Sequence, residues 1–240
     1  MKKNVFILVG NYGSGKTEIA LHLSIKGAKR GERAVIVDLD IVNPFFRSGY
    51  YRELLEREKI RLIAAKVTPE ASDVPVVVPD VLAAFDSDFG TVVFDVGGNP
   101  VGATALGQYQ RKFCLVPPEN LHMLFVVNIC RPLTSNAQDI MEMLDSISAT
   151  SRLSVTGLIN NTNLGAESSL ALLYEGDAVL KEVSQKTGIP VTYCAVSHEL
   201  AQSQNFNSLS ELSGELMLLE LYTTLDWDDC WPQMTGFSAL

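Results

Sequence analysis

The chain has 240 residues, 47% of them hydrophobic, and a formal net charge of −9 at pH 7. This length is sufficient to bury a substantial core, either as one large α/β domain or as two small ones. The negative charge argues against a nucleic-acid binder, because that affinity comes mostly from Lys and Arg that neutralise phosphates. No Lys or Arg follows Lys186, and the acidic residues beyond it should keep that end away from anionic lipid as well.

Strand-like and helix-like segments alternate to about residue 205 without a low-complexity linker. This alternation predicts a single α/β domain spanning residues 1–240. No apolar run approaches the ~20 residues needed to cross a bilayer, so we expect no membrane segment. The cysteines are scattered without a C-x-x-C pair, which favours reduced thiols in a cytoplasmic protein; they are Cys114, Cys130, Cys194 and Cys230.

The first strong motif fits the phosphate-binding pattern GxxxxGK[ST] at every fixed position. It lies between an apolar run at residues 5–9 and a helix-like segment, which is the strand, loop and helix context that the motif requires. Its glycines allow backbone N–H groups to turn toward phosphate oxygens, while Lys16 is expected to reach the β- and γ-phosphates and Thr17 to hold Mg²⁺. A glycine-rich turn with a chance lysine is the alternative. The motif comprises Gly10, Asn11, Tyr12, Gly13, Ser14, Gly15, Lys16 and Thr17.

Two carboxylates follow the second predicted strand. Residues 33–38 form a short apolar run that ends in Asp38, and Asp40 comes two residues later. Such a run is typical of a buried parallel strand whose carboxyl end faces a site, and alternation along an extended chain points both acids to the same side. Beside a phosphate loop we favour Mg²⁺ and water chemistry for this pair over helix capping.

A second strand ending in a carboxylate comes later in the chain. Residues 91–95 form an apolar run that ends in Asp95, the Walker B pattern, in which the carboxylate holds Mg²⁺ directly or through its water. Gly97 and Gly98 follow at once and would let the backbone approach a γ-phosphate and rearrange when it leaves. A plain glycine-rich β-turn is the alternative.

The strand predicted at residues 153–159 ends in a run of amides, Asn160, Asn161, Thr162 and Asn163. Guanine-selective GTPases carry an N-K-x-D pattern at a comparable place, and the position of its aspartate is Asn163 here. An amide offers both a donor and an acceptor, so Asn160 or Asn161 would satisfy adenine, and we favour ATP over GTP. A loop that uses Asn for turn geometry is the alternative.

The remaining elements are predicted from hydrophobic periodicity. We expect a strand at residues 121–129, a helix at 135–148 capped by Thr134 or Ser135, a helix at 167–187, a strand at 190–196 and a short helix after Ser197. From about residue 205 the tail is predicted to be helical, since its apolar residues recur at helical spacing at Leu209, Leu212, Leu216, Leu219 and Tyr222. Trp227 and Trp231 end it, and we expect packing rather than partner docking there.

The order of these motifs resembles the MinD/ParA-like group of P-loop ATPases, in the SIMIBI class. The resemblance covers nearly the whole domain, and further shared segments are residues 127–132, 157–161 and 190–201. It implies a doubly wound, mostly parallel sheet and an ATPase that works as a nucleotide-sandwiched homodimer read by a partner protein. It also implies that Lys16 and Thr17 bind phosphate and Mg²⁺, that Asp40 orients the attacking water, and that Asp38 and Asp95 complete the Mg²⁺ shell.

The sequence departs from this family at one position. The family carries a signature lysine directly after the first glycine of the loop, and Asn11 stands there in this chain. Asn11 donates a hydrogen bond but carries no charge, so we expect slow hydrolysis by the isolated protein. Arg47, in the loop after Asp40, is the nearest cation by sequence that a partner would bring in, although pairing with an acid on the following segment is the alternative.

These observations predict an ATP-dependent switch or maturation factor that acts on a client protein. An acidic tail disfavours a basic membrane-binding helix, and the net charge disfavours a DNA-binding face. Two rival functions stay open: a small-molecule kinase or ATP-dependent ligase on the same scaffold, and a nucleotide-binding regulator with negligible turnover.

Overall fold

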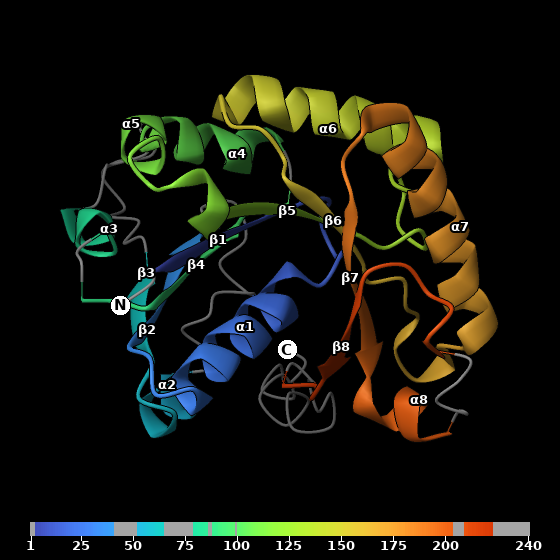
Figure 1. The fold of residues 1–240 in the computed structure, drawn as a ribbon, viewed down its shortest axis with the longest axis horizontal. Coiled ribbons are helices and arrows are strands. Elements are labelled where there is room, and N and C mark those ends of the chain that lie inside the picture. Colours follow the sequence, from blue (N-terminus) through green and yellow to red (C-terminus); the bar gives the residue numbers. More distant parts are fainter. Residues whose placement is uncertain are drawn as a thin grey trace, which may run out of the picture.

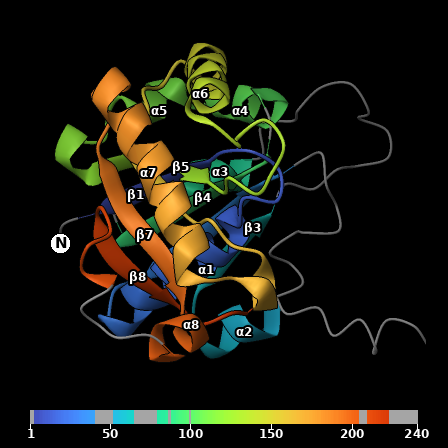
Figure 2. The same ribbon diagram turned by 90° about the vertical axis from the view of Figure 1, so that its right-hand side faces the viewer.

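The fold is built on one eight-stranded sheet whose strands pair only in parallel, in the order β3-β2-β4-β1-β5-β6-β7-β8. This computed structural model describes residues 3–40, 52–64, 79–85, 88–98, 100–203 and 209–222. The sheet twists through the middle of the molecule, with helices on both sides (Figures 1 and 2). The strands are β1 (Asn4–Val9), β2 (Ala34–Leu39), β3 (Arg61–Ala64), β4 (Thr91–Val96), β5 (Leu121–Val127), β6 (Gly157–Asn160), β7 (Val191–Ser197) and β8 (Glu215–Leu219).

Helices cover both faces of the sheet, as expected for a doubly wound α/β fold. The longer ones begin and end close to the predicted positions, and α7 ends at Gly188, whose left-handed backbone (φ 76°) suits glycine. The helices are α1 (Lys16–Lys29), α2 (Arg52–Arg57), α3 (Pro79–Ala83), α4 (Pro100–Gly107), α5 (Gln110–Phe113), α6 (Ala137–Ser151), α7 (Leu170–Thr187) and α8 (His198–Ser203).

Alternation along the central strands directs neighbouring side chains into two different core clusters, one on each face of the sheet. In β1, Ile7 points into a cluster that contains residues of α3, α4, α5, α6 and α7, whereas the neighbouring Leu8 points into a cluster with α1 and α2. Both residues are fully buried. A strand covered on both faces needs a continuous apolar run, and this explains why the sequence of β1 lacks a polar side.

The helical tail predicted from about residue 205 is wrong within the described residues. Residues 215–219 form β8, which pairs in parallel with β7 through Tyr193↔Glu215 to Ser197↔Leu219. Met217 and Leu219 are buried while Leu218 is 41% exposed, which is the alternation of a strand. A run of four apolar residues is compatible with either period, and pairing with an otherwise open sheet edge favours the strand.

The amino-terminal cap of α6 also differs from the prediction. The helix begins at Ala137, two residues later than expected, and Asn136 is its N-cap, accepting a hydrogen bond from the backbone N–H of Asp139 at 3.0 Å. Thr134, one of the predicted caps, is fully buried and donates instead to the backbone oxygen of Asn128 at 3.0 Å. Its hydroxyl therefore shapes the turn between β5 and α6.

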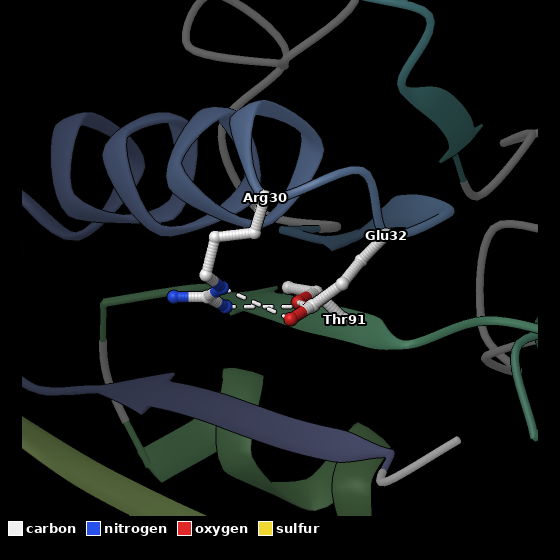
Figure 3. Close-up of polar contacts among 3 residues, drawn as sticks. All are labelled: Arg30, Glu32 and Thr91. Carbon is white, nitrogen blue, oxygen red and sulfur yellow. Dashed lines mark hydrogen bonds and ion pairs between the residues drawn. The ribbon is translucent and has the colours of Figure 1, made fainter.

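A small polar cluster lies at the edge of the sheet where β4 begins. Arg30, just after α1, donates through Nε to Glu32 at 2.9 Å, and Thr91 at the start of β4 donates its hydroxyl to the same carboxylate (Figure 3). The Arg30 guanidinium holds the pKa of Glu32 below its usual value. This cluster ties the carboxyl end of α1 to the central strand β4.

Candidate nucleotide-binding site

The carboxyl ends of β1, β2, β4 and β5 meet around the loop of residues 10–17, which joins β1 to α1. The loop needs glycine at two points because other parts of the site lie against its backbone. A Cβ on Gly10 would lie 2.4 Å from the backbone oxygen of Val126, and one on Gly15 would lie 2.2 Å from Nδ2 of Asn161. Both glycines also have positive φ, 140° and 88°, which L side chains rarely adopt.

Lys16 lies inside this loop rather than in solvent. It is 7% exposed, and its Nζ donates to the backbone oxygens of Asn11 at 2.8 Å and Gly10 at 3.3 Å. Burial lowers the pKa of Lys16, while Asp95 and Asp40 act in the opposite direction. The ammonium group is thus held at the centre of the loop, where a phosphate would replace its two backbone acceptors.

Three acids gather beside the loop. Asp38 and Asp95 are register partners on β2 and β4, and both are buried. Asp95 accepts a hydrogen bond from the Thr17 hydroxyl at 2.7 Å, and Asp38 accepts one from the backbone N–H of Asp40 at 3.0 Å. The order of pairing in the sheet therefore places carboxylates that are 57 positions apart in the chain side by side.

The electrostatics of these acids favour a cation. Burial raises the pKa of Asp95 to about 7, with a further contribution from the neighbouring Asp38. Carboxylates that oppose one another's ionisation, together with the Thr17 hydroxyl, form an oxygen donor set of the kind that Mg²⁺ prefers. Among the described residues no three His, Cys, Asp or Glu side chains form a closed metal site. In nucleotide sites Mg²⁺ takes further ligands from phosphate and water.

The turn after β4 presses on the phosphate loop. A Cβ on Gly98 would lie 2.6 Å from both N and Cα of Tyr12, and one on Gly97 would lie 2.9 Å from Oδ1 of Asp40. A larger residue at either position would displace the loop or the acid. The turn is therefore in direct contact with both the phosphate loop and the predicted water-orienting residue.

Most of these groups line one cavity of about 530 Å³, within the range of ligand pockets. Asp38 and Gly97 are not among its lining residues; the predicted site residues that line it are Tyr12, Gly13, Gly15, Lys16, Thr17, Asp40, Asp95 and Gly98. Sequence reasoning gave no role to two further lining residues, Arg131 and Pro132, in the turn between β5 and α6. Both residues follow directly after a buried parallel strand. Their role at the site could have been predicted from this position, because turns at the carboxyl ends of such strands line the ligand site.

The predicted base-reading amides occupy different positions. Asn160 is fully buried, with Nδ2 donating to the backbone oxygen of Leu173 at 3.1 Å and Oδ1 accepting from Thr162 N at 3.2 Å. The amide of Asn160 is thus bound inside the protein, and contact of Asn160 or Asn161 with the base stays a prediction. Asn161 donates Nδ2 to the backbone oxygen of Ser14 at 2.7 Å and so supports the phosphate loop.

Asn161 and Asn163 also line a second cavity, of about 130 Å³, which shares Gly15 and Glu18 with the first. Its other side is formed by the end of β7, the start of α8 and residues at and beyond the end of β8. Asn163 donates Nδ2 to Asn161 O at 2.8 Å and accepts from Gly165 N at 3.3 Å, which shapes the loop at this cavity. The location next to the phosphate loop suits a nucleoside.

Asn11 stands where the signature lysine of the resembling family would be. Its Nδ2 donates to the backbone oxygen of Pro132, and its Oδ1 accepts from the backbone N–H of Tyr12 at 2.8 Å. The side chain thus connects the phosphate loop to the turn after β5. Arg47, Trp227 and Trp231 lie outside the described residues, as do residues 65–78.

No protein-family model and no curated protein sequence matches the chain. Solved structures match it in shape. The signal recognition particle receptor FtsY from Elizabethkingia anophelis has a TM-score of 0.55 at 22% identity over 87% of this chain and 62% of that one. The same receptor in complex with GDP has a TM-score of 0.54 at 21% identity over 82% of this chain and 57% of that one. Cell division protein FtsY from Thermotoga maritima has a TM-score of 0.52 at 18% identity over 81% and 62%.

The chain has the fold of a P-loop NTPase. At these identities the likeness establishes the fold alone. The chain spans about three-fifths of the length of the FtsY proteins that it matches. None of the helices in the described part of the chain is both long and apolar enough to cross a membrane.

Proposed function

We propose that the protein is a Mg²⁺-dependent nucleoside triphosphatase, with ATP as its nucleotide, that acts as a switch or maturation factor for a partner protein. The observation that carries this proposal is the convergence of the buried Lys16, the Thr17 hydroxyl and the acids Asp40 and Asp95 on one cavity around a GxxxxGK[ST] loop, with Asp38 paired to Asp95 in the sheet. Phosphate binding needs the lysine and the loop, and hydrolysis also needs a group that orients water.

Each residue has a distinct part in this proposal. Lys16 and the backbone of the loop bind the β- and γ-phosphates, and Thr17, Asp38 and Asp95 would hold the Mg²⁺. When bound, Mg²⁺ neutralises charge on the terminal phosphates. Asp40 orients the attacking water from its position on the same cavity as Lys16.

The contact between Gly98 and Tyr12 supports the switch. A γ-phosphate between Lys16 and the turn after β4 would set the position of that turn, and its loss on hydrolysis would release it. Tyr12 is 57% exposed, so a change in its backbone support would alter the surface that a partner or a second copy of the chain meets.

The proposed preference for ATP rests on the cavity next to the loop. Guanine presents N1–H and N2–H donors that GTPases satisfy with a carboxylate, and the corresponding loop position here is the amide Asn163. Glu18 is the one carboxylate among the described lining residues, and it already accepts from the backbone N–H of Tyr222. GDP is bound by one of the FtsY structures, so GTP is the competing nucleotide in any test.

Calorimetry with Mg·ATP tests the proposal through two variants. Lys16→Ala should abolish measurable binding because it removes the buried cation that faces the phosphates. Asp40→Ala should bind Mg·ATP like the parent but lose turnover, since its proposed part concerns water alone. Lys112→Ala and Asp145→Ala, both exposed and remote from the cavity, are matched controls. Normal binding by Lys16→Ala would contradict the proposed function.

A further inference from the structure

The turn between β5 and α6 brings a cation to the phosphate loop from within the same chain. Arg131 donates Nε to the backbone oxygen of Gly13 at 3.1 Å. A Cβ on Gly13 would lie 3.2 Å from Nε and 3.6 Å from Cζ of Arg131, so the guanidinium rests against the middle of the loop. Arg131 also lines the same cavity as Lys16 and Asp40.

The backbone that carries Arg131 is held in place from both sides. The buried Asn128 accepts from Arg131 N at 3.1 Å and from the Thr134 hydroxyl at 3.0 Å through its backbone oxygen. Asn128 Oδ1 accepts from Cys130 N at 3.0 Å, which closes the turn from within. On the other side, Asn11 donates to the oxygen of Pro132. The position of Arg131 is thus set before any ligand arrives, which is what an electrostatic catalyst requires.

The charge of Arg131 is not neutralised by the protein. Across the described ranges the Arg131 side chain forms no ion pair, and Nε is the one atom of its guanidinium that makes a hydrogen bond. Both terminal nitrogens of the guanidinium therefore keep their donors for another anion. A guanidinium pairs well with phosphate oxygens because it offers parallel N–H donors in one plane.

Given the proposed function, we propose that Arg131 supplies in cis the positive charge that Asn11 does not. In hydrolysis a bond forms between the water oxygen and the γ-phosphorus, and the bond from that phosphorus to the bridging oxygen breaks. The electron pair leaves with the diphosphate, and a water proton passes to the phosphate product. Arg131 neutralises the negative charge that spreads over the γ-phosphate oxygens during this step. Asn11, which lacks the charge, holds the turn that provides it.

The test compares the full-length parent with Arg131→Ala, Arg131→Lys and the control Arg111→Ala, an exposed residue on α5. Calorimetry measures the affinity for Mg·ADP and for Mg·ADP with aluminium fluoride, which mimics the γ-phosphoryl group in the transition state of its transfer. Single-turnover hydrolysis of ATP is followed in parallel. Thermal unfolding verifies that each variant is folded.

Arg131→Ala should bind Mg·ADP within about threefold of the parent, because the diphosphate is bound by the loop and Lys16. Its extra affinity for the aluminium fluoride complex should fall at least about tenfold, and its hydrolysis rate ~10³-fold or more, the lower end of the range that such arginines contribute. For Arg131→Lys, both the affinity for the aluminium fluoride complex and the hydrolysis rate should lie between those of the parent and of Arg131→Ala. Millimolar guanidinium should raise the rate of Arg131→Ala and leave that of Arg111→Ala unchanged, which loss of loop support alone would not produce.

Two results would overturn the inference while leaving the proposed function intact. One is an undiminished preference of Arg131→Ala for the aluminium fluoride complex. The other is an equal loss of affinity for Mg·ADP and for the complex, without rescue by guanidinium, which would make Arg131 a support of the loop only. Failure of the parent to bind Mg·ADP and Mg·ATP at all would instead contradict the proposed function, and the inference with it.

Discussion

At the scale of single residues, the ionised carboxylate of Asp95 is unfavourable for the folded protein without a cation but suited to binding one. Its carboxyl group is 3% exposed and beside Asp38, so ionisation in the metal-free protein opposes both burial and a like charge. The hydrogen bond from Thr17 offsets only part of this effect. Such an arrangement is typical of a cation-binding site, because a bound cation compensates the negative charges of the two acids.

Asp95→Asn should therefore stabilise the metal-free protein at high pH. The pKa of Asp95 is about 7 in the folded chain against an ordinary 3.8, so the folded state holds its proton more tightly and loses stability as pH rises between these values. At pH 8 the variant should unfold a few degrees above the parent, and this difference should narrow toward pH 4. Binding of Mg·ATP should weaken at the same time.

Thermal unfolding at both pH values, with and without Mg²⁺, measures this effect, and Asp145→Asn on the surface of α6 is the control. A difference between parent and variant that is the same at pH 4 and pH 8 would show that Asp95 does not titrate in this range.

At the scale of elements, α1 links the two ends of the sheet. Its first turn carries Lys16 and Thr17 at the cavity, while just beyond its last turn Arg30 and Glu32 contact Thr91 at the start of β4 (Figure 3). β4 in turn ends in Asp95 at the cavity. α1 and β4 are thus joined at both ends. At the cavity Thr17 donates to Asp95, and at the other end of the sheet Glu32 contacts both Arg30 and Thr91.

Glu32→Gln should lower stability at neutral pH by up to about 1 kcal/mol, since it weakens a charge-assisted pair whose arginine is partly exposed. The pKa of Glu32 is lowered in the folded state, and the largest cause is the hydrogen bond from Arg30. Its contribution is therefore present above the usual glutamate pKa and is lost as pH falls through the folded value. Urea unfolding at pH 7 and pH 3 measures it, with the exposed Glu56→Gln as the control. An unchanged deficit at pH 3 would refute the charge-based explanation.

At the scale of the whole molecule, the proposed nucleotide would couple both halves of the sheet. The phosphate cavity lies at β1, β2 and β4, whereas the adjoining smaller cavity lies at β6, β7 and β8. A nucleotide in both cavities would therefore cross-link the two halves. Because it binds only the folded chain, it should stabilise the protein by about 2.7 kcal/mol at one hundred times its dissociation constant.

Mg·ATP should raise the unfolding temperature more than Mg·GTP at equal concentration. The reason is the absence of a carboxylate at position 163 for the guanine donors, and each tenfold preference corresponds to about 1.4 kcal/mol. Asn163→Asp should shift the preference toward GTP. The control is Asn136→Asp, which makes the same change in charge at the exposed N-cap of α6. An equal or larger shift with Mg·GTP in the parent would contradict the proposed base.

The sequence by itself determined the elements whose signal is local. The strands that end in Asp38 and Asp95 are continuous apolar runs, and the phosphate loop follows from glycine and lysine spacing within eight residues. Their common destination at the carboxyl edge of a parallel sheet follows from general topology, so the gathering of these residues was predictable.

Only the tertiary structure decided the rest, because the deciding contacts join distant residues. β8 is a strand since it pairs with β7, although its apolar run fits a helix equally well. Asn160 donates to a carbonyl of α7, and the phosphate loop contacts the turn after β5 from Asn11 to Pro132 and from Arg131 to Gly13, across about 120 positions of sequence. Hydrogen bonds between such distant groups leave no periodic trace in the sequence, and for that reason pattern alone did not reveal them.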